Sequence, residues 1–146
     1  MNISFLDTWR NRRRGGGPGP SSAAAAREQE GITELLSECE LLRVHAMRLG
    51  LRLDDSVDSL SALDQLPPRW REDKEELPWF GNDAGLYLGT VIVRTVPGAR
   101  WNIWPSGHPV VRLASGREIQ VVEAGLDWAV TGAPELAQVY AEAAEA

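Results

Sequence analysis

Residues 82–113 read NDAGLYLGTVIVRTVPGA followed directly by RWNIWPSGHPVVRL. The first part is apolar nearly all round over residues 84–96, which predicts a buried central helix. The β-branched residues in its second half also suit a buried strand, so the sequence alone leaves that alternative open. Gly85 and Gly89 lie four residues apart. On a helix they would share one face and let a neighbouring element approach closely.

The second part of this stretch alternates between apolar and polar residues, as a β-hairpin does. If Gly107 closes a three-residue loop in the left-handed conformation, Trp101 pairs with Val111. That register places the apolar side chains on one face, as a one-sided sheet requires. A third short strand is expected to follow around Ile119 and Val121.

Helices are predicted upstream and downstream of this centre. One amphipathic helix is expected over residues 28–49, and Gly50 is placed to end it. Its apolar stripe recurs at alternating steps of three and four residues and consists of Ile32, Leu35, Cys39, Leu42, Ala46 and Leu49. A shorter helix with Asp55 at its N-cap follows, then an irregular connection over residues 69–81. Two more helices close the chain.

The expected fold class is α+β, with helices packed around a small antiparallel sheet of two or three strands and a disordered N-terminal arm. Residues 1–27 combine an Arg cluster with a Gly/Pro run and a Ser/Ala run, which is typical of a flexible arm and linker. Residues 28–146 are expected to form one domain. That length is enough to hold an apolar core without disulfides or metals.

Charge and cysteine content limit the classes of function. The formal net charge is −6, and the basic residues of the arm make the remainder more acidic still. An acidic body repels phosphate backbones, so no nucleic-acid partner is expected. Cys39 is the only cysteine, which excludes an intrachain disulfide and favours a reducing, cytoplasmic location. No apolar run approaches the roughly 20 residues of a membrane span, no export signal is recognised, and no cofactor is predicted.

Several segments resemble one known family. Residues 82–99, the following RWNIWPSGHPVVRLASGREI and the closing GAPELAQVYAEAAE are similar to a family of uncharacterised actinobacterial proteins that carry a domain of unknown function. The resemblance extends upstream through LLSECELLR and SLSALDQL. It supports the fold boundaries. It implies no established activity and offers no catalytic motif to carry over.

The residues themselves suggest no enzyme. A Ser or Cys nucleophile needs a positioned base, and only two histidines are present, His45 and His108. His45 is interpreted as a solvated surface residue, His108 as a turn residue, and Cys39 as an inert buried thiol. No nucleophile elbow, phosphate loop or dinucleotide fingerprint occurs. Asp83, interpreted as a helix N-cap, and nearby Tyr87 are the one place where a small-molecule site or active site is considered.

Two groups of residues remain as candidate contact sites. Trp104, His108 and Arg112 are expected on the outward face of the hairpin, where an exposed Trp beside an Arg is typical of a protein contact. Trp70, Trp79 and Trp128 are instead expected to pin connections to the body. In the arm, the candidate contacts for a protein or an anionic membrane surface are Phe5, Trp9, Arg12, Arg13 and Arg14.

The predicted function is therefore a non-catalytic protein-interaction or adaptor module with an unknown protein partner. The first alternative is a peripheral membrane module anchored by the arm. The second is a small-molecule-binding domain or an enzyme of unknown class. The sequence does not indicate an oligomeric state.

Overall fold

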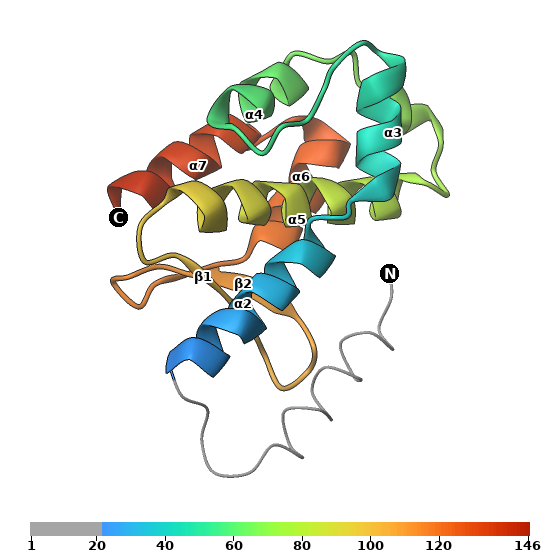
Figure 1. Ribbon diagram of the computed structural model, residues 1–146. Helices are drawn as coiled ribbons and strands as arrows, with labels where there is room; N and C mark the ends of the chain where they lie inside the picture. The colour runs from blue at the N-terminus through green and yellow to red at the C-terminus, as the bar shows by residue number, and fades with distance from the viewer. Residues whose placement is uncertain (1–21) are drawn as a thin grey trace.

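The computed structural model describes residues 22–146 and contains helices packed around a three-stranded antiparallel sheet, which confirms the predicted α+β class (Figure 1). The predictions made for residues 1–21, including a disordered arm, lie outside the described residues. In chain order the elements are α2 (Ser22–Leu36), α3 (Glu40–Arg48), α4 (Val57–Asp64), the 3-10 helix η1 (Arg69–Glu72), α5 (Leu77–Thr95), β1 (Arg100–Ile103), β2 (Pro109–Arg112), β3 (Glu118–Ile119), α6 (Val121–Thr131) and α7 (Leu136–Glu145).

Helix α5 is the centre of the fold, and residues 84–95 are helix rather than strand. It crosses the middle of the molecule, with α6 behind it in the view of Figure 1 and the sheet packed on the opposite side from α4 and α7. Ala84, Leu88 and Ile92 along its length have no exposed surface. Even so, none of the helices in the described range 22–146 is long and apolar enough to cross a bilayer.

The start of α5 differs from the sequence-based expectation. The helix begins at Leu77, inside the stretch 69–81 that was predicted to be irregular, and the predicted cap Asp83 lies within it. Pro78 occupies the first turn, where its missing N–H would have no helical partner anyway. Just before the helix, the Asp73 carboxylate accepts hydrogen bonds from two backbone N–H groups at 3.1 Å each. The true start signal is therefore Pro78 with Asp73 ahead of it.

Close packing of α5 against α6 depends on glycines from both helices. A Cβ on Gly85 would collide with the backbone of Val121 and would lie 2.6 Å from the Cα of Val122. A Cβ on Gly125 would collide with the backbone of Gly81 and of Gly85. The close approach predicted at Gly85 is thus confirmed. The two helices bury their apolar faces because neither carries a side chain at the crossing.

The hairpin has the predicted register. Trp101 pairs with Val111 across β1 and β2, and Gly107 adopts a φ of 91° in the connecting loop. Trp101 is 2% exposed, and its indole packs where a Cβ on Gly89 would otherwise stand. The third strand is shorter than predicted, because β3 ends at Ile119 and the next helix begins two residues later.

The helix predicted over residues 28–49 is two helices. Helix α2 begins at Ser22, within residues 15–27 that were predicted to be linker. It ends at Leu36, and α3 begins only at Glu40. Between them Cys39 adopts a φ of 37°, a left-handed conformation that a non-glycine residue rarely takes. The apolar spacing continues through this break, so the pattern alone gave no sign of it.

Side chains from elsewhere stabilise the two helix ends at this break. The Arg43 guanidinium donates to the backbone carbonyl oxygens of Ser37, at 3.1 and 2.9 Å, and of Glu38, at 3.2 Å. Asp83 of α5 accepts a hydrogen bond from the N–H of Leu42 in the first turn of α3, at 3.2 Å. These contacts replace hydrogen bonds that a continuous helix would have made.

Two aspartates have roles other than those predicted. The N-cap of α4 is Ser56, not Asp55. Asp55 instead forms ion pairs with Arg43, at 3.1 Å, and with Arg94, at 3.3 Å. Asp64, at the end of α4, accepts hydrogen bonds at 2.9 and 3.0 Å from the first two N–H groups of α7. It therefore caps a helix that begins far away in the sequence.

The tryptophans divide into buried and exposed groups. Trp70 stacks on Phe80, with 4.6 Å between ring centroids, and on Trp128 at 5.0 Å. Its indole N–H donates to the carbonyl oxygen of Ala129 at 2.8 Å. The prediction that Trp70 and Trp128 pin connections to the body is confirmed. For Trp79 it was wrong, because that side chain is 51% exposed.

Candidate functional site

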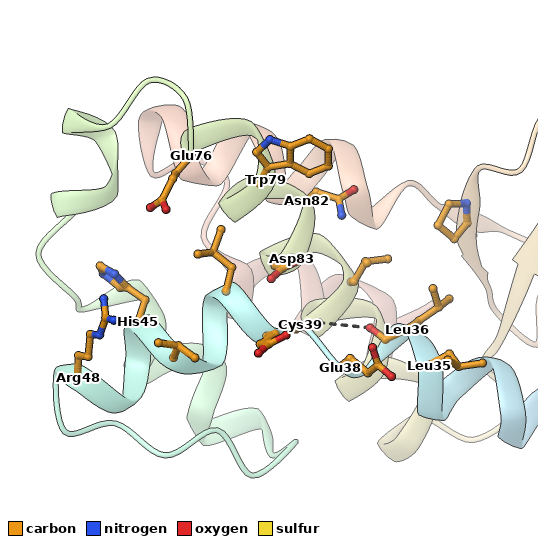
Figure 2. Close-up of a pocket in the computed structure, with 15 residues that line it drawn as sticks. Leu35, Leu36, Glu38, Cys39, His45, Arg48, Glu76, Trp79, Asn82 and Asp83 are labelled. Atoms are coloured by element: carbon orange, nitrogen blue, oxygen red, sulfur yellow. Dashed lines mark hydrogen bonds between the residues drawn. The ribbon is translucent and has the colours of Figure 1, made fainter. Parts of the chain in front are cut away.

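A groove of about 750 Å³ lies between the α2–α3 junction and one side of α5. Figure 2 shows Trp79, Asn82 and Asp83 of α5 along one wall, facing Cys39 and Leu36 on the other. The groove follows from the helix break. A continuous helix over residues 28–49 would not turn at Cys39, and this wall would not form.

Exposed apolar side chains line the groove. Among residues 22–146, six large hydrophobic side chains are exposed, and three of these, Leu35, Val44 and Trp79, belong to its lining. They come from α2, α3 and α5 respectively. Leu35 was predicted to be a core residue, but it is 41% exposed while Leu42, on the same predicted stripe, is fully buried. The predicted burial of Leu35 was wrong because the apolar stripe runs over two helices, α2 and α3, that point in different directions.

Carboxylates from all the walls border these apolar groups. They are Glu38, Glu40, Glu76 and Asp83. None of the four forms a salt bridge with any other described residue. Like charges that share a groove repel one another, and a bound cation would relieve that repulsion. The groove therefore combines apolar surface with carboxylates that no described residue pairs in a salt bridge.

Asp83 is the most constrained of these carboxylates. It is half-buried, and burial raises its pKa, while hydrogen bonds from the backbone N–H groups of Leu42 and Leu41 act in the opposite direction. Its side chain fixes the first turn of α3 against α5. Asp83 thus helps to build the groove as well as to line it.

The opposite end of the groove carries the basic residues His45 and Arg48, which face Glu76 in Figure 2. His45 was expected to be a solvated surface residue, but its ring meets Phe80 edge-on at 5.1 Å. Burial and the neighbouring Arg48 charge lower the pKa of His45. Its Nε2 atom is buried and has no hydrogen-bond partner in the described part of the chain. The imidazole ring therefore packs as part of the aromatic cluster with Phe80 and Trp70.

Cys39 lies on the groove floor but is poorly suited to act as a nucleophile. It is 5% exposed, and its thiol donates a hydrogen bond to the carbonyl oxygen of Leu36 at 3.3 Å (Figure 2). Burial, followed by the nearby charge of Asp83, raises its pKa well above the ordinary value. The thiol rather than the thiolate is favoured. In residues 22–146 no group of three or more His, Cys, Asp or Glu side chains is arranged to hold a metal ion.

The groove does not include Tyr87, the other residue considered for a small-molecule site. The Tyr87 ring is fully buried, and its hydroxyl lies 2.6 Å from the Ser59 hydroxyl and accepts from the N–H of Asp55 at 2.9 Å. Its polar atom is therefore already used within the fold. Asp83 and Tyr87 do not form a common site.

Comparison with known proteins identifies the family. The whole chain, residues 1–146, matches a family model described as a family of unknown function, DUF6278. The chain belongs to this family. No curated protein and no solved structure matches it. Membership confirms the resemblance noted in the sequence, while the actinobacterial origin stays a prediction.

Of the hairpin residues predicted as a contact site in this DUF6278 protein, Trp104 and His108 lie side by side. The rings of Trp104 and His108 lie 5.1 Å apart, and Arg112 is exposed on the neighbouring strand. The Trp104 side chain is half-buried. Its indole N–H donates a hydrogen bond to Glu118 at 3.3 Å, which fixes its orientation. Val110, which alternation along β2 places on the same face as His108 and Arg112, is fully buried. The face is smaller than predicted, and its role as a partner contact stays a prediction.

The candidate arm contacts Phe5, Trp9, Arg12, Arg13 and Arg14 lie outside the described residues. What the sequence missed is the groove itself. Val44 and Trp79 were not proposed as binding residues, although two signals were present. Val44 lies off the apolar stripe of its helix, and Trp79 follows a helix-starting proline. An apolar residue off the buried stripe is a candidate for a surface contact.

Proposed function

We propose that this DUF6278 protein is a non-catalytic protein-interaction module that binds a basic, amphipathic segment of a partner protein in the groove between α2, α3 and α5. One observation carries the proposal: three exposed apolar side chains converge on a groove bordered by four carboxylates that form no ion pair with any residue of the described range 22–146. Apolar side chains that gather at a groove rimmed by polar residues mark a candidate protein or ligand contact.

The shape of the lining favours a helical or extended peptide. Leu35, Val44 and Trp79 stand on three different elements, so an amphipathic helix laid along the groove could contact all of them with one face. Trp79 is the expected anchor, because tryptophans often carry much of the binding energy at interfaces. Arg or Lys side chains flanking that face would meet the carboxylates.

The charge of the groove argues against other ligand classes. Phosphate groups of nucleic acids or anionic lipids would be repelled by Glu38, Glu40 and Glu76. The groove residues also supply no nucleophile paired with a base, since the Cys39 thiol is bonded to a backbone carbonyl oxygen. A protein partner in the cytoplasm remains the proposal that fits these groups best.

The test is a selection for peptides that bind the intact chain. Random peptides of about 14 residues, long enough for a groove-bound helix, are displayed on phage and selected against the protein. We expect enriched peptides with apolar residues at helical spacing and flanking Arg or Lys. Their affinities are then measured by fluorescence anisotropy for the intact protein and for single variants whose thermal melts are unchanged.

Two exposed valines provide a matched comparison. Val44 lines the groove, whereas Val130 lies on α6 outside it, and both are exposed. Val44→Asp and Trp79→Ala should each weaken binding about 10-fold or more, as the loss of an interface anchor does. Val130→Asp should leave it unchanged. Equal losses for Val44→Asp and Val130→Asp, or a selection that enriches acidic peptides, would contradict the proposal.

A further inference from the structure

The groove has a complementary segment within its own chain. Residues 1–14, MNISFLDTWRNRRR, place the apolar residues Ile3, Phe5, Leu6 and Trp9 ahead of four arginines, against a single carboxylate at Asp7. This is the composition that the groove is proposed to select: an apolar face with flanking positive charge. We propose that residues 1–14 bind in the α2–α3–α5 groove of the same chain and thereby regulate access of a partner segment to it.

The length of the chain permits this contact. Residues 15–21 separate the arm from Ser22, the first residue of α2. Seven extended residues reach about 23 Å. The 15 residues of α2 span about 22 Å at 1.5 Å per residue. In Figure 1 the end of α2 lies beside α5, where the groove is lined by Leu35 and Leu36. A linker that runs back along α2 therefore brings the arm to the groove.

The charges match as well as the lengths. Four arginines of the arm would meet Glu38, Glu40, Glu76 and Asp83, which have no salt-bridge partners among the described residues. Trp9 and Phe5 would cover Trp79 and Val44. A segment of 14 residues does not form a stable helix alone in water, so binding in the groove would supply the packing that the isolated segment lacks.

An arm tethered in this way competes with any partner. A short linker gives an effective concentration on the order of 1 mM. An arm that binds with an intrinsic dissociation constant of about 0.1 mM would then occupy the groove about nine-tenths of the time, and it would weaken a competing peptide about 10-fold. Removal of the arm from the groove, by a competing surface or by proteolysis in the linker, would release the site.

The inference rests on the proposed function, and one titration separates the two. A peptide from the selection above is titrated into the intact wild-type chain, into Phe5→Ser/Trp9→Ser, and into the control Asn11→Ser. We expect about 10-fold tighter binding to the double variant and unchanged binding to the control. Equal binding to all three chains would overturn the inference and leave the proposed function standing. Binding to none of them would overturn both.

A second measurement locates the arm directly. In ¹H–¹⁵N spectra of the intact chain, Phe5→Ser/Trp9→Ser should shift the Trp79 indole N–H and the amides of Leu35 and Val44, and it should leave the Trp104 indole unchanged. Unchanged groove signals would overturn the inference. A dimer in sedimentation experiments that the double variant abolishes would also overturn it, because the arm would then bind a second copy rather than its own chain.

Discussion

Asp83 and Asp64 perform, from distant helices, the capping that a local residue usually performs. Asp83 bonds the first turn of α3, and Asp64 bonds the first two N–H groups of α7. Neither helix has a side-chain cap from its own N-cap residue, Cys39 or Glu135. A capping pattern read from neighbouring residues cannot find such contacts, because the partners are separated by 41 and 72 residues.

The Asp83 contact predicts a pH dependence. Burial raises the pKa of Asp83 in the folded state above its ordinary value of 3.8, so the folded protein holds this proton more tightly than the unfolded chain does. The contribution of Asp83 to the free energy of unfolding is therefore largest below pH 3.8 and declines as the pH rises through the folded-state pKa.

The variant Asp83→Asn removes this titration and keeps an acceptor oxygen. Relative to Asp83→Asn, the wild type should lose stability as the pH rises from about 3 to about 7. Urea denaturation at four pH values across that range measures the difference. A difference that stays constant, or that moves in favour of the wild type as the pH rises, would show that burial does not control this carboxyl group.

Asp64→Ala should destabilise the fold by about 1 kcal/mol, because it leaves the first two N–H groups of α7 without their acceptor. Asp127→Ala is the matched control, since Asp127 is exposed on α6 and a surface change of this kind has an effect of about 0.5 kcal/mol or less. Chemical denaturation compares the two. If both variants unfold at the same denaturant concentration, Asp64 is not a functioning cap.

At the scale of elements, two helical glycines allow the effect of close helix packing on stability to be measured apart from the effect of helix propensity. A Cβ on Gly85 would collide with α6, whereas one on Gly31 in α2 would have nothing within 4 Å. Gly31→Ala should stabilise the protein by about 0.5–1 kcal/mol through helix propensity. Gly85→Ala should destabilise it by about 1–3 kcal/mol or more through overpacking. Thermal melts of both variants test this, and a Gly85→Ala protein as stable as the wild type would contradict the described α5–α6 contact.

The hairpin contains a second matched pair. Trp101 is buried on Gly89, while Trp104 is half-buried and bonded to Glu118. Trp101→Ala should cost about 3–5 kcal/mol, and Trp104→Ala about 1 kcal/mol for its hydrogen bond. Denaturation curves measure both. Equal costs would place Trp104 in the core and remove it as a candidate contact residue.

The sequence predicts an element correctly when the residues that determine it are close together in the chain. The predicted hairpin register was correct because both of its signals are local. These are the three-residue loop that ends at Gly107 and the alternation of apolar and polar residues between Trp101 and Val111. The central helix was correct because its apolar run is long. The break at Cys39 could not be predicted, because contacts of Arg43 and Asp83 stabilise it and neither contact is visible in the spacing of apolar residues.

At the scale of the whole molecule, that single break explains why the groove was missed. With one helix over residues 28–49, Leu35 faces the core and Val44 faces solvent on an unrelated side. With the chain turned at Cys39, both residues line one groove together with Trp79. The candidate site thus depends on tertiary contacts, which the sequence pattern does not show. The segment proposed to bind it can be recognised in the sequence itself, as an apolar stretch followed by arginines.

The most direct test of the groove as a binding site is a ¹H–¹⁵N titration of the intact Phe5→Ser/Trp9→Ser chain with a synthetic peptide of residues 1–14. We expect saturable shifts at the Trp79 indole N–H and at the amides of Leu35 and Val44, and we expect added salt to weaken the binding because exposed charges contribute to it. The Trp104 indole should not move. Shifts confined to Trp104 and His108, or no saturable shifts at all, would contradict this expectation.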